Sequence, residues 1–357
     1  MTYLNTVITG TGSYIPTEVV ENKSFAEQDF YSEKSEKLNS PGEEIIQKFY
    51  EITGIKERRY LQKDQVVSDI AAIAAERAIK DAGIDPESID QIIVAHNFGD
   101  VKYNNTQTDI LPSIASRVKR YLQIKNPSCV AYDILFGCPG WIQGLIQADA
   151  YIKAGLGKRF LVIGAEALSR VVDDFDRDSM IYSDGAGAAI IDGIEEEEKR
   201  GVLSSSMQTD TIDEAYYLFW GPSNKPGEDP DRKYIKMHGR KIYEYAISKV
   251  PAAMKLALDK SGNEVSNIKK ILIHQANEKM DEAIVKRFYR LYKEKVPKDI
   301  MPMSISLLGN SSVATVPTLY DGILKGNFPN HEINKNDILL FASVGAGMNI
   351  NSFVYKK

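Results

Sequence analysis

The feature that most constrains the fold is an internal repeat, because the second half of the chain repeats sequence patterns of the first half in the same order. The segment SDGAGAAIID, residues 183–192, matches SVGAGMNINS, residues 343–352, and both carry S-x-G-A-G. We predict that each forms a glycine-bearing turn that runs into a strand. A duplicated chain builds two copies of one unit, so the repeat limits where a shared site can lie.

A second repeated pattern precedes each of these segments. AAERAIKDAGIDPESIDQIIVAHN in the first half matches AMKLALDKSGNEVSNIKKILIHQAN in the second. Each reads as a helix, a glycine, a loop and a buried strand, with Gly83 and Gly262 ending the helices and the runs IIVA and ILI forming the strands. Both predicted strands end in a polar loop, at His96 and at His274.

A third repeated pattern is a helix that begins near Cys138 in the first half and near Asn310 in the second. Since helices alternate with apolar strands in both halves, the sequence predicts an α/β architecture with helices around mostly buried sheets. The charge run GIEEEEKRG reads as a solvated turn, so we divide the chain into residues 1–200 and residues 201–357. The Pro-, Gly- and Tyr-rich stretch 207–234 reads as a long loop, of the kind that forms lids or pocket walls.

Charge and composition exclude several classes of protein. The formal net charge is -5, which offers no positive field for a long nucleic acid. No run of about 18 apolar residues is present, so we expect no membrane span, and the first ten residues lack the pattern of a secretory leader. Two cysteines and four scattered histidines indicate neither a disulfide framework nor a metal site. We expect a cytoplasmic protein with both thiols reduced.

Cys138 is the candidate nucleophile. It lies in FGCPGW, between a predicted strand and a predicted helix, and Pro139 suits the first helical turn. A cysteine at a helix N-terminus is stabilised as the thiolate, which is its reactive form. Gly137 and Gly140 leave room for a substrate, whereas Cys129 lies within a predicted strand and reads as a buried structural residue.

His274 and Asn310 are the candidate partners of that cysteine. His274 begins HQAN at the end of a predicted strand, where an imidazole can exchange hydrogen bonds with a ligand. Asn310 lies in LLGNSSVATVP, where it can cap the following helix, and its amide N–H groups can also donate to a developing oxyanion.

These motifs together resemble those of the ketoacyl-ACP synthase III family of thiolase-fold condensing enzymes, over nearly the whole chain. FGCPGW is similar to the family's nucleophile motif, ILIHQAN to its histidine motif, LLGNSSVATVP to its asparagine motif, and VGAG near the C-terminus to its glycine-rich loop. The resemblance implies a thiolase-like α/β fold in which two pseudo-duplicated halves form a five-layered αβαβα arrangement.

The resemblance also implies a reaction, an acyl transfer in fatty acid biosynthesis. Acyl-CoA or acyl-ACP would acylate Cys138, and decarboxylative Claisen condensation with malonyl-ACP would then give a 3-oxoacyl-ACP. His274 and Asn310 would stabilise the enolate, while the backbone N–H groups of Cys138 and Ala346 would hold the tetrahedral oxyanion. No cofactor is implied, because the substrates themselves carry phosphopantetheine on acyl carrier protein or CoA.

Further expectations carried by the resemblance concern binding. Asn277 and Gly239 would line the phosphopantetheine tunnel, Arg177 would lie near the CoA nucleotide, and the chain would form a homodimer. The chain departs from the family where an arginine before TGI is replaced by Ile52, and Lys48 lies near the place of a family tryptophan. The choice between CoA and ACP as acyl donor is therefore open.

Other functions remain open at the level of sequence. The nearest are same-fold synthases of the alkylresorcinol, polyene or hydroxymethylglutaryl-CoA type, and the last of these requires a carboxylate, for which Asp100 is the candidate. More distant alternatives are a Cys–His hydrolase and a non-catalytic acyl-carrier-binding paralogue.

Overall fold

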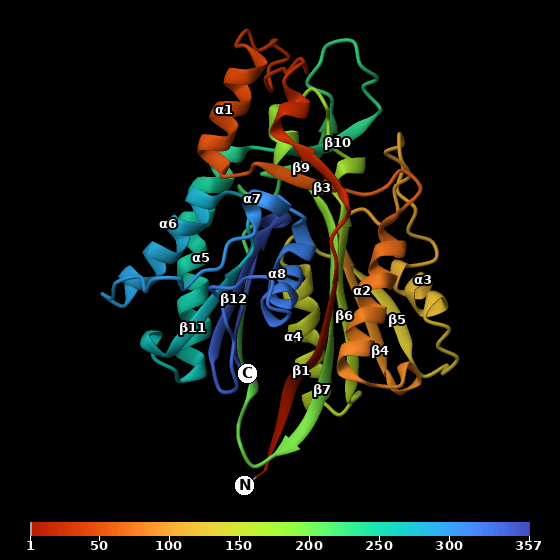
Figure 1. Cartoon of the computed structure of the whole chain (residues 1–357), viewed down its shortest axis with the longest axis vertical. Coiled ribbons are helices and arrows are strands. Elements are labelled where there is room, and N and C mark those ends of the chain that lie inside the picture. Colours follow the sequence, from red (N-terminus) through yellow and green to blue (C-terminus); the bar gives the residue numbers. More distant parts are fainter. Residues whose placement is uncertain (1) are drawn as a thin grey trace.

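Two β-sheets alternate with three layers of helices in the computed structural model of the protein, which describes residues 2–357 (Figure 1). One outer layer contains α2 (Val67–Ala82) and α3 (Ile114–Tyr121), the middle layer contains α4 (Gly140–Lys153) and α8 (Thr315–Leu324), and the other outer layer contains α5 (Gly239–Ser261) and α6 (Glu278–Leu291). The apolar core is accordingly divided into one cluster between the sheets and one cluster outside each sheet. The predicted five-layered αβαβα arrangement is confirmed.

Four strands of each of the two large sheets share one topology, which confirms the duplication. The first has the order β1-β7-β6-β4-β5 and the second the order β8-β13-β12-β11. In both, the first two pairings are antiparallel and the third is parallel. The strands of the first sheet are β1 (Tyr3–Tyr14), β4 (Gln91–His96), β5 (Val130–Leu135), β6 (Arg159–Ala167) and β7 (Asp184–Glu196), and those of the second are β8 (Gly201–Thr209), β11 (Ile268–Ile273), β12 (Ile338–Gly345) and β13 (Asn349–Lys356).

The predicted helix ends and buried strands are also confirmed. Gly83 ends α2 with φ of 64° and Gly262 ends α5 with φ of 73°, both left-handed conformations that glycine adopts without a steric penalty. The strands β4 and β11 that follow are largely buried. His96 is the last residue of β4 and His274 follows β11, so the two histidines lie at equivalent places in the two sheets.

The glycine-bearing turn predicted for residues 183–192 is wrong, although the turn in the second half exists. Gly185 and Gly187 lie within β7, whereas the second copy turns at Gly347, with φ of 71°. Close packing explains the glycine in β7, because a Cβ at Gly187 would lie 2.6 Å from the Pro317 side chain of α8. The repeated glycine therefore permits helix packing in one half and a turn in the other.

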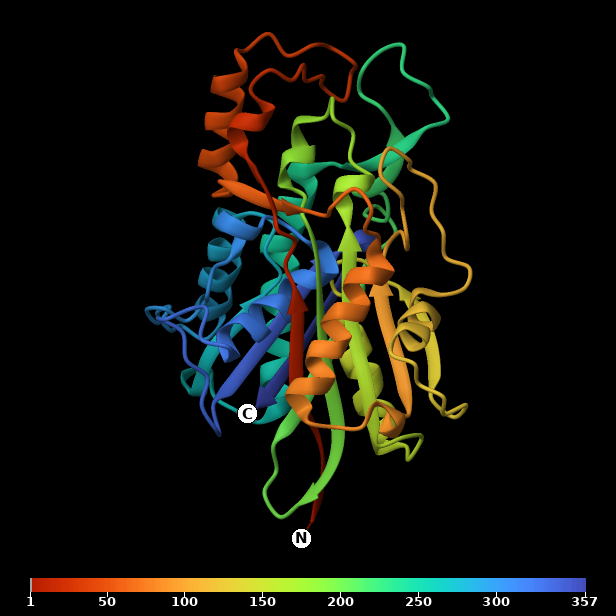
Figure 2. The same ribbon diagram turned by 45° about the vertical axis from the view of Figure 1, so that its right-hand side comes forward.

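Several short elements cover the ends of both sheets, far from the N-terminus (Figure 2). They are β2 (Glu18–Glu21), α1 (Gly42–Thr53), β3 (Glu57–Tyr60), β9 (Leu218–Pro222), β10 (Lys233–Met237) and α7 (Ile305–Leu308). The long loop predicted for residues 207–234 is interrupted, because this stretch contains the end of β8, all of β9 and the first two residues of β10, which pairs with β9. Nothing in its turn-rich composition indicated the pairing.

Buried ion pairs fix β10 in place. The Lys236 ammonium lies 2.5 Å from a carboxylate oxygen of Asp173 and 3.0 Å from one of Asp176. Its Nζ also donates to the side-chain oxygen of Asn224 at 2.9 Å. Because a buried ammonium needs such partners, these contacts hold β10 against the segment that follows β6. No helix within residues 2–357 has the length and apolar character needed to cross a bilayer.

Candidate active site

A cavity of about 260 Å³ lies between the two halves and is lined by Cys138, His274 and Asn310. Cys138 follows β5 and precedes α4, whereas His274 follows β11 and Asn310 follows α7. The three side chains thus come from parts of the chain that the duplicated topology brings to the same end of both sheets. Their convergence agrees with the placement that the sequence predicted.

Ser312 connects all three residues. Its hydroxyl lies 3.4 Å from Cys138 Sγ, and its backbone N–H donates to Asn310 Oδ1 at 2.8 Å. Its backbone also lies beside the His274 imidazole, where it partly opposes the lowering of the imidazole pKa by burial. Ser312 has φ of 53°, a left-handed conformation that is uncommon for serine and that the turn closed by Asn310 maintains.

The Cys138 thiol is partly exposed because it faces the cavity, whose walls otherwise enclose it. Burial raises the pKa of this thiol to about 11, and the hydrogen bond from Ser312 opposes the rise. The thiolate expected from the position before α4 is therefore not the resting form. The sequence located the start of the helix, but it did not reveal how completely the folded chain would remove water from the sulfur.

The His274 imidazole is neutral at physiological pH. It is 4% exposed, and burial lowers its pKa to about 4. Within residues 2–357, its Nδ1 atom has no hydrogen-bond partner. A neutral imidazole carries one N–H donor and one acceptor nitrogen, so the tautomer with its hydrogen on Nε2 can donate a hydrogen bond to a ligand in the cavity.

The Asn310 side chain closes a turn and does not cap α8, which begins five residues later at Thr315. Because Oδ1 accepts the Ser312 N–H, the amide nitrogen is the end that is left to donate into the cavity. The prediction that Asn310 caps the following helix is therefore wrong. The side chain does make a local structural contact, but with the turn at Ser312.

The glycine-rich loop after β12 lies against the turn that carries Cys138. A Cβ at Gly345 would approach the Cys138 backbone nitrogen to 2.7 Å, and a Cβ at Gly137 would approach the Ala346 nitrogen to 3.0 Å. Both glycines are therefore needed for the approach. The approach brings Cys138 and Ala346, whose backbone N–H groups are predicted to form the oxyanion site, together on the cavity wall.

A second cavity, of about 630 Å³, contains the three residues predicted to bind pantetheine or CoA. Arg177, Gly239 and Asn277 all line it, together with Lys48 and Ile52. The side chain of Asn277 also caps α6, because its Oδ1 accepts the Met280 N–H at 3.0 Å. The two cavities adjoin, since both are lined by Ile181, Met237, Ile242, Ala276 and Met280.

Apolar walls enclose the inner cavity, and part of them comes from the stretch 207–234, which the sequence analysis interprets as a candidate lid or pocket wall. The rings of Trp220 in β9 and Phe98 after β4 pack at a tilt of 33° with centroids 4.8 Å apart, and both residues line the cavity. The other apolar lining residues on this side are Leu168, Leu218, Phe219, Ile235 and Met237. The signal available in the sequence was the unusual ending of the β4 strand, HNFGD, but it carried no information on the contact with Trp220.

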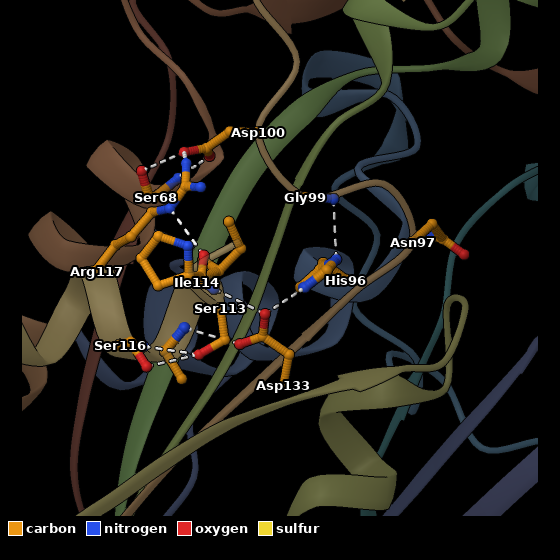
Figure 3. A network of polar contacts seen from close by, with 12 residues as sticks. Ser68, His96, Asn97, Gly99, Asp100, Ser113, Ile114, Ser116, Arg117 and Asp133 are labelled. Atoms are coloured by element: carbon orange, nitrogen blue, oxygen red, sulfur yellow. Dashed lines mark hydrogen bonds and ion pairs between the residues drawn. The ribbon is translucent and has the colours of Figure 1, made fainter. Parts of the chain in front are cut away.

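Asp100 does not reach the cavity, contrary to its candidacy as an acid or base. Its carboxylate accepts hydrogen bonds from the Ser68 N–H at 2.7 Å and the Ser68 hydroxyl at 2.6 Å, and it pairs with Arg117 at 2.6 Å (Figure 3). In the same network His96 contacts the Asp133 carboxylate at 3.0 Å. These interactions occupy both groups and fix α3 against β4, so this network is structural and offers no carboxylate to the cavity.

Comparisons with known proteins agree with these observations. A sequence profile described as 3-oxoacyl-[acyl-carrier-protein (ACP)] synthase III matches residues 132–211, and its C-terminal counterpart matches residues 258–357. The chain is 32% identical to a beta-ketoacyl-[acyl-carrier-protein] synthase III of Staphylococcus haemolyticus, with 99% of each chain covered. It is also 32% identical to the enzyme of that name from Caldanaerobacter subterraneus, with 98% of this chain and 97% of the relative covered.

Solved structures give the same result. The crystal structure of 3-oxoacyl-[acyl-carrier-protein] synthase III from Aquifex aeolicus matches with a TM-score of 0.80 and 28% identity, covering 99% of this chain and 100% of the other. The Thermus thermophilus structure matches with a TM-score of 0.81 and 28% identity, covering 98% and 99%. The thiolase-like fold is confirmed, and this chain belongs to the ketoacyl-ACP synthase III family.

Proposed function

We propose that this protein is a 3-oxoacyl-ACP synthase III, an acyltransferase that is acylated on Cys138 and then condenses the acyl group with malonyl-ACP. The observation that carries the proposal is one apolar cavity lined by a thiol, an imidazole and a carboxamide, in a chain of this family. A second cavity adjoins it and is large enough for the arm of a carrier thioester.

In the first step the Cys138 sulfur attacks the carbonyl carbon of an acyl thioester, and the carrier leaves as its thiol. The proton lost by the Cys138 thiol is transferred to the departing sulfur, so no net proton is released. The oxyanion that forms in between would accept hydrogen bonds from the backbone N–H groups of Cys138 and Ala346. Formation of the thioester divides a difficult carbon–carbon bond formation into two easier steps.

In the second step malonyl-ACP loses CO₂, and the electron pair of the broken carbon–carbon bond forms an enolate. Neutral His274 and the Asn310 amide nitrogen would both donate hydrogen bonds to the enolate oxygen. The enolate carbon then attacks the acyl group on Cys138, and the sulfur leaves as the thiolate and takes one proton from water, which is the one proton that decarboxylative condensation consumes. Donors that are fixed before the reaction stabilise such a charge without reorganisation.

The substrates and partners follow from the two cavities. The apolar inner cavity fits an uncharged acyl chain, while Lys48, Arg177 and Arg240 in the outer cavity could bind the phosphates of acyl carrier protein or CoA. Both are substrates that carry phosphopantetheine, so we propose no separate cofactor. Cys129 and Cys138 are free thiols, which suits a reducing cytoplasm.

The homodimer implied by the resemblance remains a proposal, and β5 supports it. This strand is at the edge of the first sheet, where Val130 is 53% and Leu135 is 65% exposed. An exposed apolar edge strand favours pairing with a second copy. We likewise propose residues 1–200 and 201–357 as the two domains, since β7 ends at Glu196 and β8 begins at Gly201.

A direct assay tests the proposed function. The protein is incubated with a panel of acyl-CoA and acyl-ACP thioesters, intact mass spectrometry identifies the acylated enzyme, and malonyl-ACP is then added. We expect the added mass to be located on Cys138 and to be lost as 3-oxoacyl-ACP is formed. A protein that is acylated by no thioester, or that releases only free fatty acid, would contradict the proposal.

The raised pKa of Cys138 predicts how the rate of alkylation at this thiol depends on pH. Because the thiol titrates at about 11, the thiolate fraction should increase about tenfold per pH unit between pH 6 and pH 9. We therefore expect the rate of iodoacetamide alkylation at Cys138 to rise throughout this range. A plateau below pH 8 would show that the thiolate is already the resting form. Since His274 titrates at about 4, its neutral form should persist over the same range.

The aromatic wall predicts a change in acyl selectivity. Trp220→Ala removes one of the two rings that form this wall and enlarges the cavity. We therefore expect the variant to accept acyl thioesters several carbons longer than those the unmodified protein accepts. We also expect its kcat/KM for short acyl thioesters to fall about tenfold. Competition between thioesters of different length measures this change. Tyr216→Ala is the matched control, because Tyr216 is 78% exposed nearby and does not line the cavity. An unchanged preference in Trp220→Ala would remove this residue from the acyl site.

A further inference from the structure

A chain of hydrogen bonds leads from the candidate nucleophile to a buried carboxylate that the proposed mechanism does not use. The Ser312 hydroxyl lies 3.4 Å from Cys138 Sγ, and Asn97 Nδ2 donates to Ser312 Oγ at 3.2 Å. The same Nδ2 donates to Glu166 Oε2 at 2.5 Å, and the Asn97 backbone N–H donates to that oxygen at 2.8 Å. Asn97 points away from the network around its neighbour His96 (Figure 3).

The hydrogens that each group can donate determine which atoms are donors and which are acceptors along this series of hydrogen bonds. A carboxylate oxygen accepts hydrogen bonds, so the Asn97 amide must present its nitrogen, not its oxygen, to Glu166. One Nδ2 hydrogen then points to Glu166 and the other to Ser312 Oγ. Because Ser312 Oγ accepts from Asn97, its own hydrogen is available for the nearby sulfur. The hydroxyl is thereby set as a donor to Cys138.

We propose that Ser312 is a further catalytic residue, whose hydroxyl donates a hydrogen bond to Cys138 Sγ, and that Asn97, held by Glu166, is the positioning residue that directs it. The inference rests on the proposed role of Cys138 as the nucleophile. A donor at this position stabilises the sulfur when it is negatively charged, before it attacks the acyl thioester and when it leaves after condensation. It therefore counteracts the enclosure that disfavours the thiolate.

Glu166 supports this reading, because its burial has no other evident use in the site. Its side chain is fully buried, and within the described part of the chain its Oε1 atom has no partner. Burying a carboxyl group with an unpaired oxygen is costly. Its other oxygen is engaged twice by Asn97, so the contact that this residue does make is the one that orients the Asn97 amide.

The experiment measures the pH profile of iodoacetamide alkylation at Cys138 in Ser312→Ala, Ser312→Gly and the unmodified protein. We expect both variants to alkylate about tenfold more slowly at any pH from 7 to 9, equivalent to an upward shift of about one pH unit. Glycine tolerates the positive φ at this position, so Ser312→Gly tests the loss of the hydroxyl without backbone strain. A profile unchanged in both variants would overturn the proposal.

Two further variants separate the hydroxyl from general effects on the turn. Ser311→Ala is the matched control, because the Ser311 hydroxyl is directed to Thr315 Oγ1 at 3.3 Å and is expected to leave the profile unchanged. An equal shift in Ser311→Ala would assign the effect to the turn and overturn the proposal. Asn97→Ala should also shift the pH profile of Cys138 alkylation upward, but by less than Ser312→Ala does. The Ser312 hydroxyl remains in this variant, and only the contact that orients it is lost. No shift in a folded Asn97→Ala, verified by its Tm, would overturn the positioning role.

The same samples distinguish this proposal from the proposed function. In Ser312→Ala, mass spectrometry should still find the acyl group on Cys138 after a longer incubation with the acyl thioester. If Cys138 of the unmodified protein is not acylated at all, the proposed function is wrong. If it is acylated and Ser312→Ala reacts at the unmodified rate, only the inference about Ser312 is wrong.

Discussion

Replacing Cys138 with alanine is expected to abolish the covalent acyl-enzyme and to lower the rate of condensation by on the order of 10⁴-fold or more. Without the sulfur, no group in the cavity can hold the acyl chain as a thioester. Malonyl decarboxylation should persist in this variant, because the donors proposed for the enolate, His274 and Asn310, remain on the cavity wall. Intact mass spectrometry measures the acyl-enzyme, and release of CO₂ from malonyl-ACP measures decarboxylation.

Cys129 provides the matched control for this variant. It is the other cysteine of the chain, it is 2% exposed next to β5, and it does not line the cavity. Burial raises the pKa of its thiol, so it should react poorly. We expect Cys129→Ala to acylate normally. If acyl transfer survives in Cys138→Ala and disappears in Cys129→Ala, the nucleophile is Cys129, and the proposed mechanism is wrong.

Replacing His274 or Asn310 with alanine is expected to lower malonyl decarboxylation by about 10²–10³-fold while acylation of Cys138 is retained. Each substitution removes one hydrogen-bond donor to the enolate, which forms only in the second step. These variants should therefore keep acylation and lose decarboxylation, whereas Cys138→Ala should lose acylation and keep decarboxylation. Separate measurement of acylation and of CO₂ release makes the two steps distinguishable in one set of samples.

Asn310→Asp separates catalysis from the structural contact of this side chain. The aspartate keeps an oxygen that can accept the Ser312 N–H, so the turn should survive. It replaces the amide donor with an acceptor, so decarboxylation should fall as in Asn310→Ala. Should Asn310→Asp decarboxylate at the normal rate, Asn310 would be a turn residue alone and would be excluded from the enolate site.

Much of the fold could be predicted from the sequence because it depends on local patterns repeated twice. The glycines that end α2 and α5 require only a left-handed φ, which residue type alone indicates. The apolar runs of β4 and β11 were recognisable because buried parallel strands are apolar on both faces. The order of these elements predicts the α/β class, while the resemblance of the motifs to the family implies the five-layered arrangement and the common site of Cys138, His274 and Asn310.

Features that depend on distant contacts could not be predicted. The pairing of β9 with β10 joins two segments of irregular composition, and it is fixed by the buried contacts of Lys236 with Asp173 and Asp176. The glycine pattern around Gly187 predicts a turn, because the sequence does not show that Pro317 lies against this glycine.

The sequence by itself determined which chemical groups this protein has and at which ends of its strands they lie, because hydrophobic periodicity and glycine positions act over a few residues. Only the tertiary structure decided the state of those groups. Enclosure by both halves raises the pKa of Cys138 and lowers that of His274, and contacts across the chain direct Asn97 toward Ser312 and place the Ser312 hydroxyl beside the sulfur. Desolvation and hydrogen-bond direction depend on every neighbour in space, and no stretch of sequence contains those neighbours.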